Sequence, residues 1–251
     1  MHRERARRIG GDAFLRREAA EGIAERLGAV QRRLAHVLDV EAHLDGDERL
    51  AAAPEAFDLA TSVLSLHAVN DLPGVLAQTR RALKPDGLFL AALFGGETLT
   101  ELRQSLAAAE VAVRGGVSPR VAPFGDVRDL GGLLQRAGFA LPVADVERTV
   151  VRYSDGLSLM RDLRALGETN VLAERSRKPM TRTLLTATMV HYAEHFADAD
   201  GKLRATFDIV YLTGWAPHES QQKPLKPGSA KTRLANALGT KERDAGEKAG
   251  G

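Results

Sequence analysis

Residues 57–96, FDLATSVLSLHAVNDLPGVLAQTRRALKPDGLFLAALFGG, carry the clearest fold pattern of the chain. Its pattern predicts a strand covered on both faces, an amphipathic helix, a turn and a second buried strand. These elements are expected at residues 57–66, 72–83, 84–87 and 88–94. A strand, a helix and a strand within about 40 residues predict a βαβ unit with parallel strands and a right-handed crossover.

Hydrophobic periodicity predicts the remaining elements. Helices are expected at residues 13–35, 97–113, 127–137, 156–167 and 179–196, and strands at 36–40, 140–152 and 203–217. Gly138 is expected to end the third of these helices, because glycine adopts the left-handed conformation of a helix C-terminus. We therefore predict an N-terminal helical segment, an α/β domain with two helical insertions, and a basic, proline-containing tail that is disordered from about residue 238. These parts cover residues 1–35, 36–220 with insertions near 97–137 and 156–196, and 221–251.

The composition narrows the class of protein. The chain has 251 residues, 44% of them hydrophobic, which is enough for a sizeable core. It has no cysteine, which excludes disulfides, thiolate catalysis and cysteine zinc sites. With 35 basic and 33 acidic residues it lacks the basic footprint of a dedicated nucleic-acid binder. No apolar run approaches the roughly 20 residues of a membrane span, and no secretory signal is recognisable, so we expect a cytoplasmic protein.

Polar and glycine residues follow two of the predicted strands, at the sheet edge where α/β proteins bind ligands. The two groups are Ser65, His67, Asn70 and Asp71, and Gly95, Gly96, Glu97 and Thr98. His67 near Asp71 is either an acid–base pair or a hydrogen-bonded structural histidine. The glycine pair either admits a ligand or forms the turn into the next helix.

Two other clusters carry alternative interpretations. His191 and His195 are four positions apart on a predicted helix, a spacing at which two histidines can bind one metal ion. No third ligand is evident, so we expect a solvated helix face and no metal. The N-terminal arginines are suited to an acidic partner, although such a run is more often a solvated chain end. They are Arg3, Arg5, Arg7 and Arg8.

The chain from about Phe14 to Ala230 resembles class I S-adenosylmethionine-dependent methyltransferases of the type 11 group. The branch it matches includes complex I assembly factor 5 and is similar to the malonyl-carrier-protein methyltransferase of biotin synthesis. Besides the first stretch, the resemblance rests on SPRVAPFGDVRDLGGLLQRAGF (118–139), LMRDLRALGETN (159–170) and TGWAPHESQQKPLKPGSA (213–230). The last of these is the most specific, because no propensity rule demands it.

The resemblance implies a Rossmann-like sheet, mostly parallel, with a C-terminal antiparallel strand pair. It implies S-adenosylmethionine as cofactor and assigns roles residue by residue. The cofactor-binding residues are Asp39, Asp47, Glu48, Ser65 and His67, and the catalytic candidates are His67, Asn70 and Asp71. Substrate or partner contacts are expected at Gly95, Gly96, Glu97, Thr98, Trp215 and His218.

One part of the methyltransferase pattern is missing. A βαβ unit needs about 30 residues, whereas the segment between Val40 and Phe57 has room only for a loop or one short helical turn. The glycine loop, the first crossover helix and the second strand are therefore expected to be absent, and Gly46 alone cannot build the loop. The loss removes backbone N–H donors on which cofactor binding depends. It also leaves a sheet edge for a partner or a second copy to cover.

Two functions remain open from the sequence. The first is an enzyme, which transfers a methyl group from S-adenosylmethionine or performs the arginine hydroxylation that the assembly-factor branch implies. The second is a non-catalytic binding or assembly module for a protein such as a respiratory complex I subunit. The acceptor, whether protein or small molecule, is not specified by any motif.

Overall fold

A computed structural model describes residues 14–170, 172, 174–222 and 239 of the chain. The chain divides into two units, Met1–Pro217 and His218–Gly251, and each is described by itself. The predicted arginine cluster at 3–8 lies outside the described residues. So does the tail, apart from residues 221, 222 and 239.

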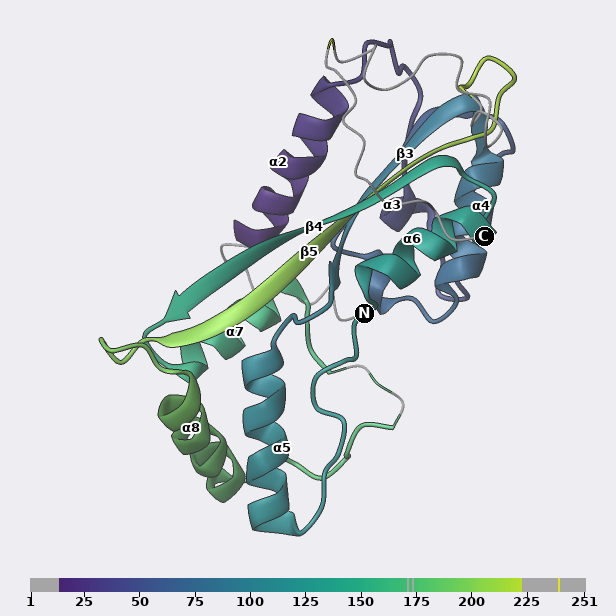
Figure 1. Ribbon diagram of the computed structural model, residues 1–251. Helices are drawn as coiled ribbons and strands as arrows, with labels where there is room; N and C mark the ends of the chain where they lie inside the picture. Colours follow the sequence, from purple (N-terminus) through teal and green to yellow (C-terminus); the bar gives the residue numbers. More distant parts are fainter. Residues whose placement is uncertain (1–13, 171, 173, 223–238, 240–251) are drawn as a thin grey trace, which may run out of the picture. The chain divides into compact units, whose positions relative to one another are not determined.

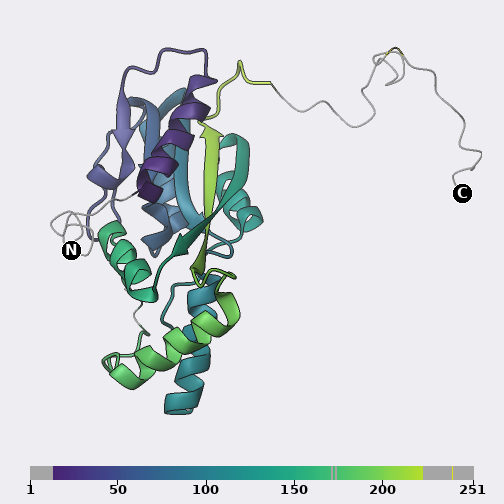
Figure 2. The same cartoon turned by 90° about the vertical axis from the view of Figure 1, so that its left-hand side faces the viewer.

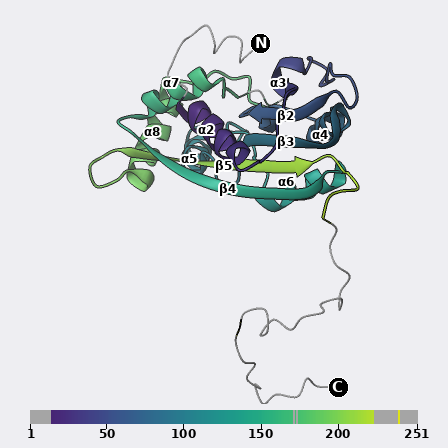
Figure 3. The same cartoon turned by 90° about the horizontal axis from the view of Figure 1, so that it is seen from above.

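The first unit contains a five-stranded sheet in the order β1-β2-β3-β5-β4 (Figure 1). The strands are β1 (Val37–Asp39), β2 (Phe57–Val63), β3 (Leu83–Gly95), β4 (Ala140–Tyr153) and β5 (Leu203–Trp215). β1, β2 and β3 are parallel, whereas β5 runs antiparallel to both of its neighbours, β3 and β4. The view from above shows β5 between them (Figure 3). This confirms the predicted Rossmann-like sheet with its C-terminal antiparallel strand pair.

Helices cover both faces of this sheet. They are α2 (Phe14–Gly28), α3 (Val40–His43), α4 (Leu72–Ala82), α5 (Thr100–Arg114), α6 (Val127–Arg136), α7 (Gly156–Leu166) and α8 (Arg182–Phe196), with a 3-10 turn, η1, at Leu66–Ala68. Apolar side chains of α2, α5, α7 and α8 belong to one core cluster, and those of α4 and α6 belong to the other. α5 and α8 cross each other at one end of the sheet (Figure 2).

The two core clusters explain the continuous apolar run of β3. Successive side chains of a strand point to opposite faces of its sheet. Leu88 and Leu90 belong to the cluster around α2 and α5, whereas Phe89 belongs to the cluster around α4 and α6. Each of these three side chains is at most 1% exposed. The segment of β3 from Leu88 to Phe94 is buried on both faces, so each of its positions is apolar.

The structure corrects the bounds of three predicted elements. The helix predicted over 13–35 ends at Gly28, and the strand predicted over 57–66 ends at Val63, because Leu64 has a φ of 46°. The predicted turn at 84–87 is an irregularity inside β3, where Asp86, not Gly87, has a positive φ of 62°. Gly87 is still required, because a Cβ there would lie 2.9 Å from the carbonyl oxygen of Lys84.

One further expectation has a direct structural counterpart. Gly138 has a φ of +86° just after the C-cap of α6, which confirms the predicted helix end. Among the described residues, no helix combines the length and apolarity required to cross a membrane.

Candidate functional site

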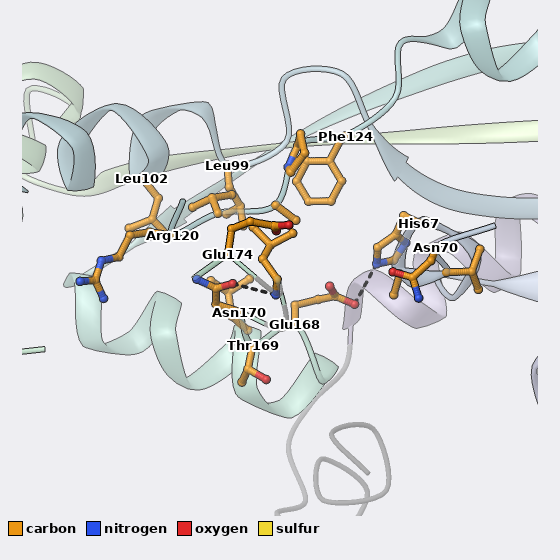
Figure 4. Close-up of a pocket in the computed structure, with 17 residues that line it drawn as sticks. His67, Asn70, Leu99, Leu102, Arg120, Phe124, Glu168, Thr169, Asn170 and Glu174 are labelled. Carbon is orange, nitrogen blue, oxygen red and sulfur yellow. Dashed lines mark hydrogen bonds and ion pairs between the residues drawn. The ribbon is translucent and has the colours of Figure 1, made fainter. Parts of the chain in front are cut away.

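A cavity of about 420 Å³ opens at the carboxyl ends of β2 and β3. Its walls come from four places in the sequence: η1 with the residues after it, the start of α5, the loop at 120–124, and the end of α7 with the segment that follows it (Figure 4). This is the edge at which α/β sheets bind ligands. The predicted residues His67 and Asn70 line the cavity, whereas Ser65 and Asp71 do not.

His67 is fixed between two partners. Its Nδ1 atom accepts a hydrogen bond from the backbone N–H of Phe94 at 3.3 Å, so Nε2 carries the proton in the neutral ring. Nε2 in turn lies 3.0 Å from Oε1 of Glu168 and donates to it. The imidazole is 5% exposed and lies 5.0 Å, between ring centroids, from the ring of Phe94. The acid that pairs with His67 is therefore Glu168 and not the neighbouring Asp71, which caps α4 by accepting from Gly74 N–H.

A buried carboxylate holds the loop that forms one wall. Glu110 of α5 is 1% exposed and accepts hydrogen bonds from the backbone N–H and hydroxyl of Ser118. It also accepts from Nε and Nη2 of Arg120, at 2.8 and 2.7 Å. Burial alone would raise the pKa of Glu110, but the bonds from Ser118 and Arg120 outweigh it and lower the pKa below its ordinary value. Glu110 is therefore ionised, and it is shared by two cations, Arg120 at 2.7 Å and Arg114, whose Nη1 lies 3.5 Å from Oε1.

The remaining polar lining of the cavity is acidic. Glu168 and Glu174 contribute carboxylates, and Asn70 and Asn170 contribute amides (Figure 4). Of the two oxygens of Glu168, Oε1 is the one that pairs with His67. The cation in the lining, Arg120, has its guanidinium bound to Glu110. Among the described residues neither Glu168 nor Glu174 forms an ion pair with a lysine or an arginine, so the lining favours a cationic guest.

The acids that the resemblance assigned to the cofactor lie elsewhere and serve the chain itself. Asp39 ends β1 and accepts from the backbone N–H of Ala42, which caps α3. Glu48 accepts from the backbone N–H groups of Asn70 and Asp71 and from the Asn70 amide. Burial would raise the pKa of Glu48, but these three hydrogen bonds lower it below its ordinary value. Neither acid lines the cavity.

The other two assigned residues complete this picture. Asp47 is exposed in the loop after α3, and its backbone N–H donates to the side chain of Asp45. Ser65 is 4% exposed, and its hydroxyl lies 2.5 Å from that of Ser62. Gly46 has space around it, since a Cβ there would meet no atom within 4 Å. The segment after β1 thus folds as α3 and a local turn and does not fit S-adenosylmethionine in the way a glycine loop does.

The segment from Gly95 to Thr98 has structural roles. A Cβ on Gly95 would lie 2.5 Å from a methyl group of Val210, and one on Gly96 would lie 2.7 Å from Oδ2 of Asp208. Glu97 donates its backbone N–H to the same Oδ2 atom, and the buried Thr98 hydroxyl donates to the Gly95 carbonyl. The two glycines are therefore required by close contacts with Val210 and Asp208. This favours the second of the two predicted roles, the turn that leads into the next helix.

Asp208 itself is bound to a cation. Nε and Nη2 of Arg148 donate to its two oxygens at 2.7 and 2.8 Å. Burial would raise the pKa of Asp208, but the bonds from Arg148 and from the Glu97 N–H lower it. This carboxylate is therefore satisfied by the protein and is not a site for a ligand.

Trp215 lies far from this edge of the sheet. In the antiparallel pair of β3 and β5, Trp215 is opposite Leu88, whereas Asp208 is opposite Gly95. Seven residues of strand separate the two positions, roughly 23 Å at the usual rise. The guanidinium of Arg32 lies 5.8 Å from the Trp215 ring centroid. The predicted partner residues Gly95 and Trp215 are therefore not brought together.

Two predicted features remain outside the cavity. His218 belongs to the second unit, where its Nδ1 lies 2.7 Å from the Ser220 hydroxyl. The rings of His191 and His195 stack with centroids 4.0 Å apart, and Nδ1 of His191 lies 3.2 Å from the Ser105 hydroxyl. The part of the chain that the structure describes contains no group of three or more side chains able to hold a metal.

Five polar residues of the cavity and its supporting loop were not predicted from the sequence. They are Glu110, Arg120, Glu168, Asn170 and Glu174. Three of them lie in the stretches SPRVAPF and LGETN, which carry the family resemblance. Polar residues that recur in motifs on loops are the signal that points to them.

Comparisons with known proteins agree with this architecture. A family model described as a methyltransferase domain matches residues 15–142. Human mitochondrial arginine-hydroxylase NDUFAF5 is 46% identical over 187 residues, which are 74% of this chain and 54% of that protein. The Dictyostelium discoideum protein of the same name is 45% identical over 186 residues, 74% of this chain and 43% of that one.

Two further matches extend the comparison. The malonyl-[acyl-carrier protein] O-methyltransferase of Methylovorus sp. is 34% identical over 221 residues, 87% of this chain and 70% of that protein. The crystal structure of the YcgJ protein of Bacillus subtilis matches with a TM-score of 0.50 at 12% identity, over 79% of this chain and 99% of that one. The second match concerns the fold alone. The chain spans about half the length of the NDUFAF5 relatives it matches.

Proposed function

This chain belongs to the methyltransferase domain family, and we propose that it serves as a binding module that receives an arginine side chain of a protein partner. The observation that carries the proposal is the cavity of about 420 Å³, whose lining presents Glu168 and Glu174 while its cation, Arg120, is bound to Glu110. A partly enclosed cavity of this size with few polar groups is typical of a ligand site.

The chemistry of the guest follows from the lining. A guanidinium is planar, always charged and offers five N–H donors, so it pairs with carboxylates in a fork-like geometry. Oε2 of Glu168, the carboxylate of Glu174 and the amide oxygen of Asn70 are the acceptors available to it. The relatives NDUFAF5 are named arginine-hydroxylases, which supports the same class of side chain. We propose a protein partner of the kind that resemblance to complex I assembly factor 5 implies, such as a respiratory complex I subunit.

Catalysis by S-adenosylmethionine is the less favoured function for this chain. The family to which the chain belongs uses that cofactor, but here β1 leads into α3, and Asp39 and Glu48 satisfy backbone N–H groups of the chain. Positioning of the cofactor contributes most of the acceleration in methyl transfer. We therefore propose that the site binds its partner without bringing a methyl donor to it.

The test is a calorimetric titration with the peptide acetyl-Gly-Arg-Gly-amide and with the same peptide carrying citrulline. Citrulline has the shape of arginine without the charge. We expect the arginine peptide to bind, the citrulline peptide to bind at least about tenfold more weakly, and Glu174→Gln to weaken arginine binding by a similar factor. The matched control is Glu194→Gln on the exposed face of α8, which should bind as the wild type does. Equal binding of the two peptides would contradict the proposal.

A second titration distinguishes a non-catalytic binding module from an enzyme that uses S-adenosylmethionine. S-adenosylmethionine and S-adenosylhomocysteine are titrated into the wild-type chain and into a variant with a glycine loop inserted between Val40 and Asp47. We expect no heat from the wild type at millimolar ligand and measurable binding by the variant. Micromolar binding by the wild type would establish the enzyme alternative.

Localisation stays a prediction. The sequence led us to expect a cytoplasmic protein, whereas the NDUFAF5 relatives are named as mitochondrial proteins. Imaging of a C-terminal fluorescent fusion in a eukaryotic cell, beside an organelle marker, distinguishes the two compartments.

A further inference from the structure

A second cavity, of about 530 Å³, lies against the same loop as the first. Arg120, Val121, Pro123 and Phe124 line both cavities, so the loop at 118–124 forms their common wall. The other side of the second cavity is formed by α5, and its apolar lining comes from both elements. Leu106, Ala107, Val117, Pro119, Val121 and Phe124 provide that lining.

The second cavity has one lining cation, Arg103, for which the described residues supply no counterion. Arg103 of α5 lines it and donates from Nη2 to the carbonyl oxygen of Thr98 at 3.1 Å. No carboxylate pairs with Arg103 within the described part of the chain. Its Nε atom is buried and has no hydrogen-bond partner there. The second cation, Arg120, is bound to Glu110.

An unsatisfied buried N–H of a cation is rare in folded proteins, because desolvating it without a partner costs free energy. Such an N–H group calls for a partner, and a water, an ion or a ligand can supply it. We propose that the second cavity binds an aliphatic carboxylate of medium chain length. The carboxylate pairs with the guanidinium of Arg103, and the hydrocarbon chain lies on the apolar lining.

The lining selects this class of ligand over others. A cation is repelled by Arg103, and a neutral alcohol leaves its guanidinium uncompensated. A free phosphate pairs with the guanidinium but leaves the apolar surface exposed to water. Variants of Arg103 and Ala107 test this proposal separately from arginine binding, because neither residue lines the first cavity.

The experiment is a calorimetric titration of the whole chain with decanoate and, separately, with decanol. We expect decanoate to bind with one site per chain and decanol to bind at least about tenfold more weakly, the factor that a charge-assisted hydrogen bond contributes. Arg103→Gln should weaken decanoate binding by a similar factor. Arg161→Gln is the matched control, since Arg161 is exposed and lines neither cavity.

A steric variant keeps the test decisive if Arg103→Gln does not fold. Ala107→Trp fills the cavity from α5 and should abolish decanoate binding, whereas Ala112→Trp, on an exposed position of the same helix, should leave it unchanged. Thermal melting of each variant shows that it is folded. The proposal is overturned by absence of decanoate binding, by equal binding of decanol, or by undiminished binding to Ala107→Trp.

Discussion

Nε2 of His67 lies 3.0 Å from Oε1 of Glu168, although 101 positions of sequence separate the two residues. The bond ties the end of β2 to the segment after α7 and closes one side of the first cavity. The hydrogen bond stabilises the fold, and both residues also line the cavity. Substitutions of Glu168 can separate these two roles.

The first prediction concerns this bond. Glu168→Gln keeps an oxygen that accepts from Nε2, so we expect the free energy of unfolding to change by less than about 1 kcal/mol. Glu168→Ala leaves the buried N–H of His67 unsatisfied and should cost about 1–3 kcal/mol. Urea unfolding of both variants measures the difference. Equal losses would show that the bond to His67 does not stabilise the fold.

The second prediction concerns Glu110. Removing one partner of a buried ion pair leaves the other charge uncompensated, so Glu110→Gln should lower the free energy of unfolding by about 3–5 kcal/mol. Ser118→Ala removes one hydroxyl donor to the same carboxylate and should cost only about 1 kcal/mol. Chemical denaturation followed by circular dichroism compares the two. A smaller loss for Glu110→Gln than for Ser118→Ala would contradict this account of the loop.

The third prediction is a pH dependence that arises from Glu48. Its pKa is lower in the folded chain than the ordinary value of 4.5, so the folded state favours the ionised form. The stabilisation is complete above the unfolded-state pKa and is lost as the pH falls through the folded-state pKa. Between pH 7 and pH 3.5, the urea concentration at the unfolding midpoint should therefore fall more for the wild type than for Glu48→Gln. Identical falls would mean that the bonds to Asn70 and Asp71 do not favour the ionised form.

The fourth prediction compares two glycines of the same helix. A Cβ on Gly22 would lie 2.3 Å from the hydroxyl of the buried Tyr211, whereas one on Gly28 would meet no atom within 4 Å. Gly22→Ala should destabilise the chain by about 1–3 kcal/mol through overpacking. Gly28→Ala should stabilise it by up to about 1 kcal/mol, because alanine is the better helix former. Thermal melting curves decide the signs, and a stabilising Gly22→Ala would refute the close packing of α2 on β5.

Much of the architecture was predictable because its cause is local. The continuous apolar run in β3 and the helical spacing of apolar residues in α4 are patterns of residues a few positions apart. The length of the segment from Val40 to Phe57 was enough to predict that no crossover helix fits there, and the structure has only the four-residue α3 in that place. The end of β2 and the irregularity inside β3 were less predictable, because they depend on the positive φ of Leu64 and of Asp86.

The candidate site was only partly predictable. The sequence placed His67 and Asn70 at the carboxyl end of a strand, and the structure places both in the lining of the cavity. It paired His67 with the nearest acid in sequence, Asp71, whereas the imidazole pairs with Glu168. Glu168 reaches His67 because α7 packs against the sheet. The spacing of residues within one motif gives no information about such a distant contact.

The family, the order of helices and strands along the chain, and the absence of a glycine loop follow from residue patterns and from the number of residues available. The pairing of charges depends on the three-dimensional arrangement instead: Arg120 is bound to Glu110, whereas Arg103 has no counterion in the described chain. The reason is that charge compensation acts over a few ångströms in space, and the fold alone determines which side chains come that close.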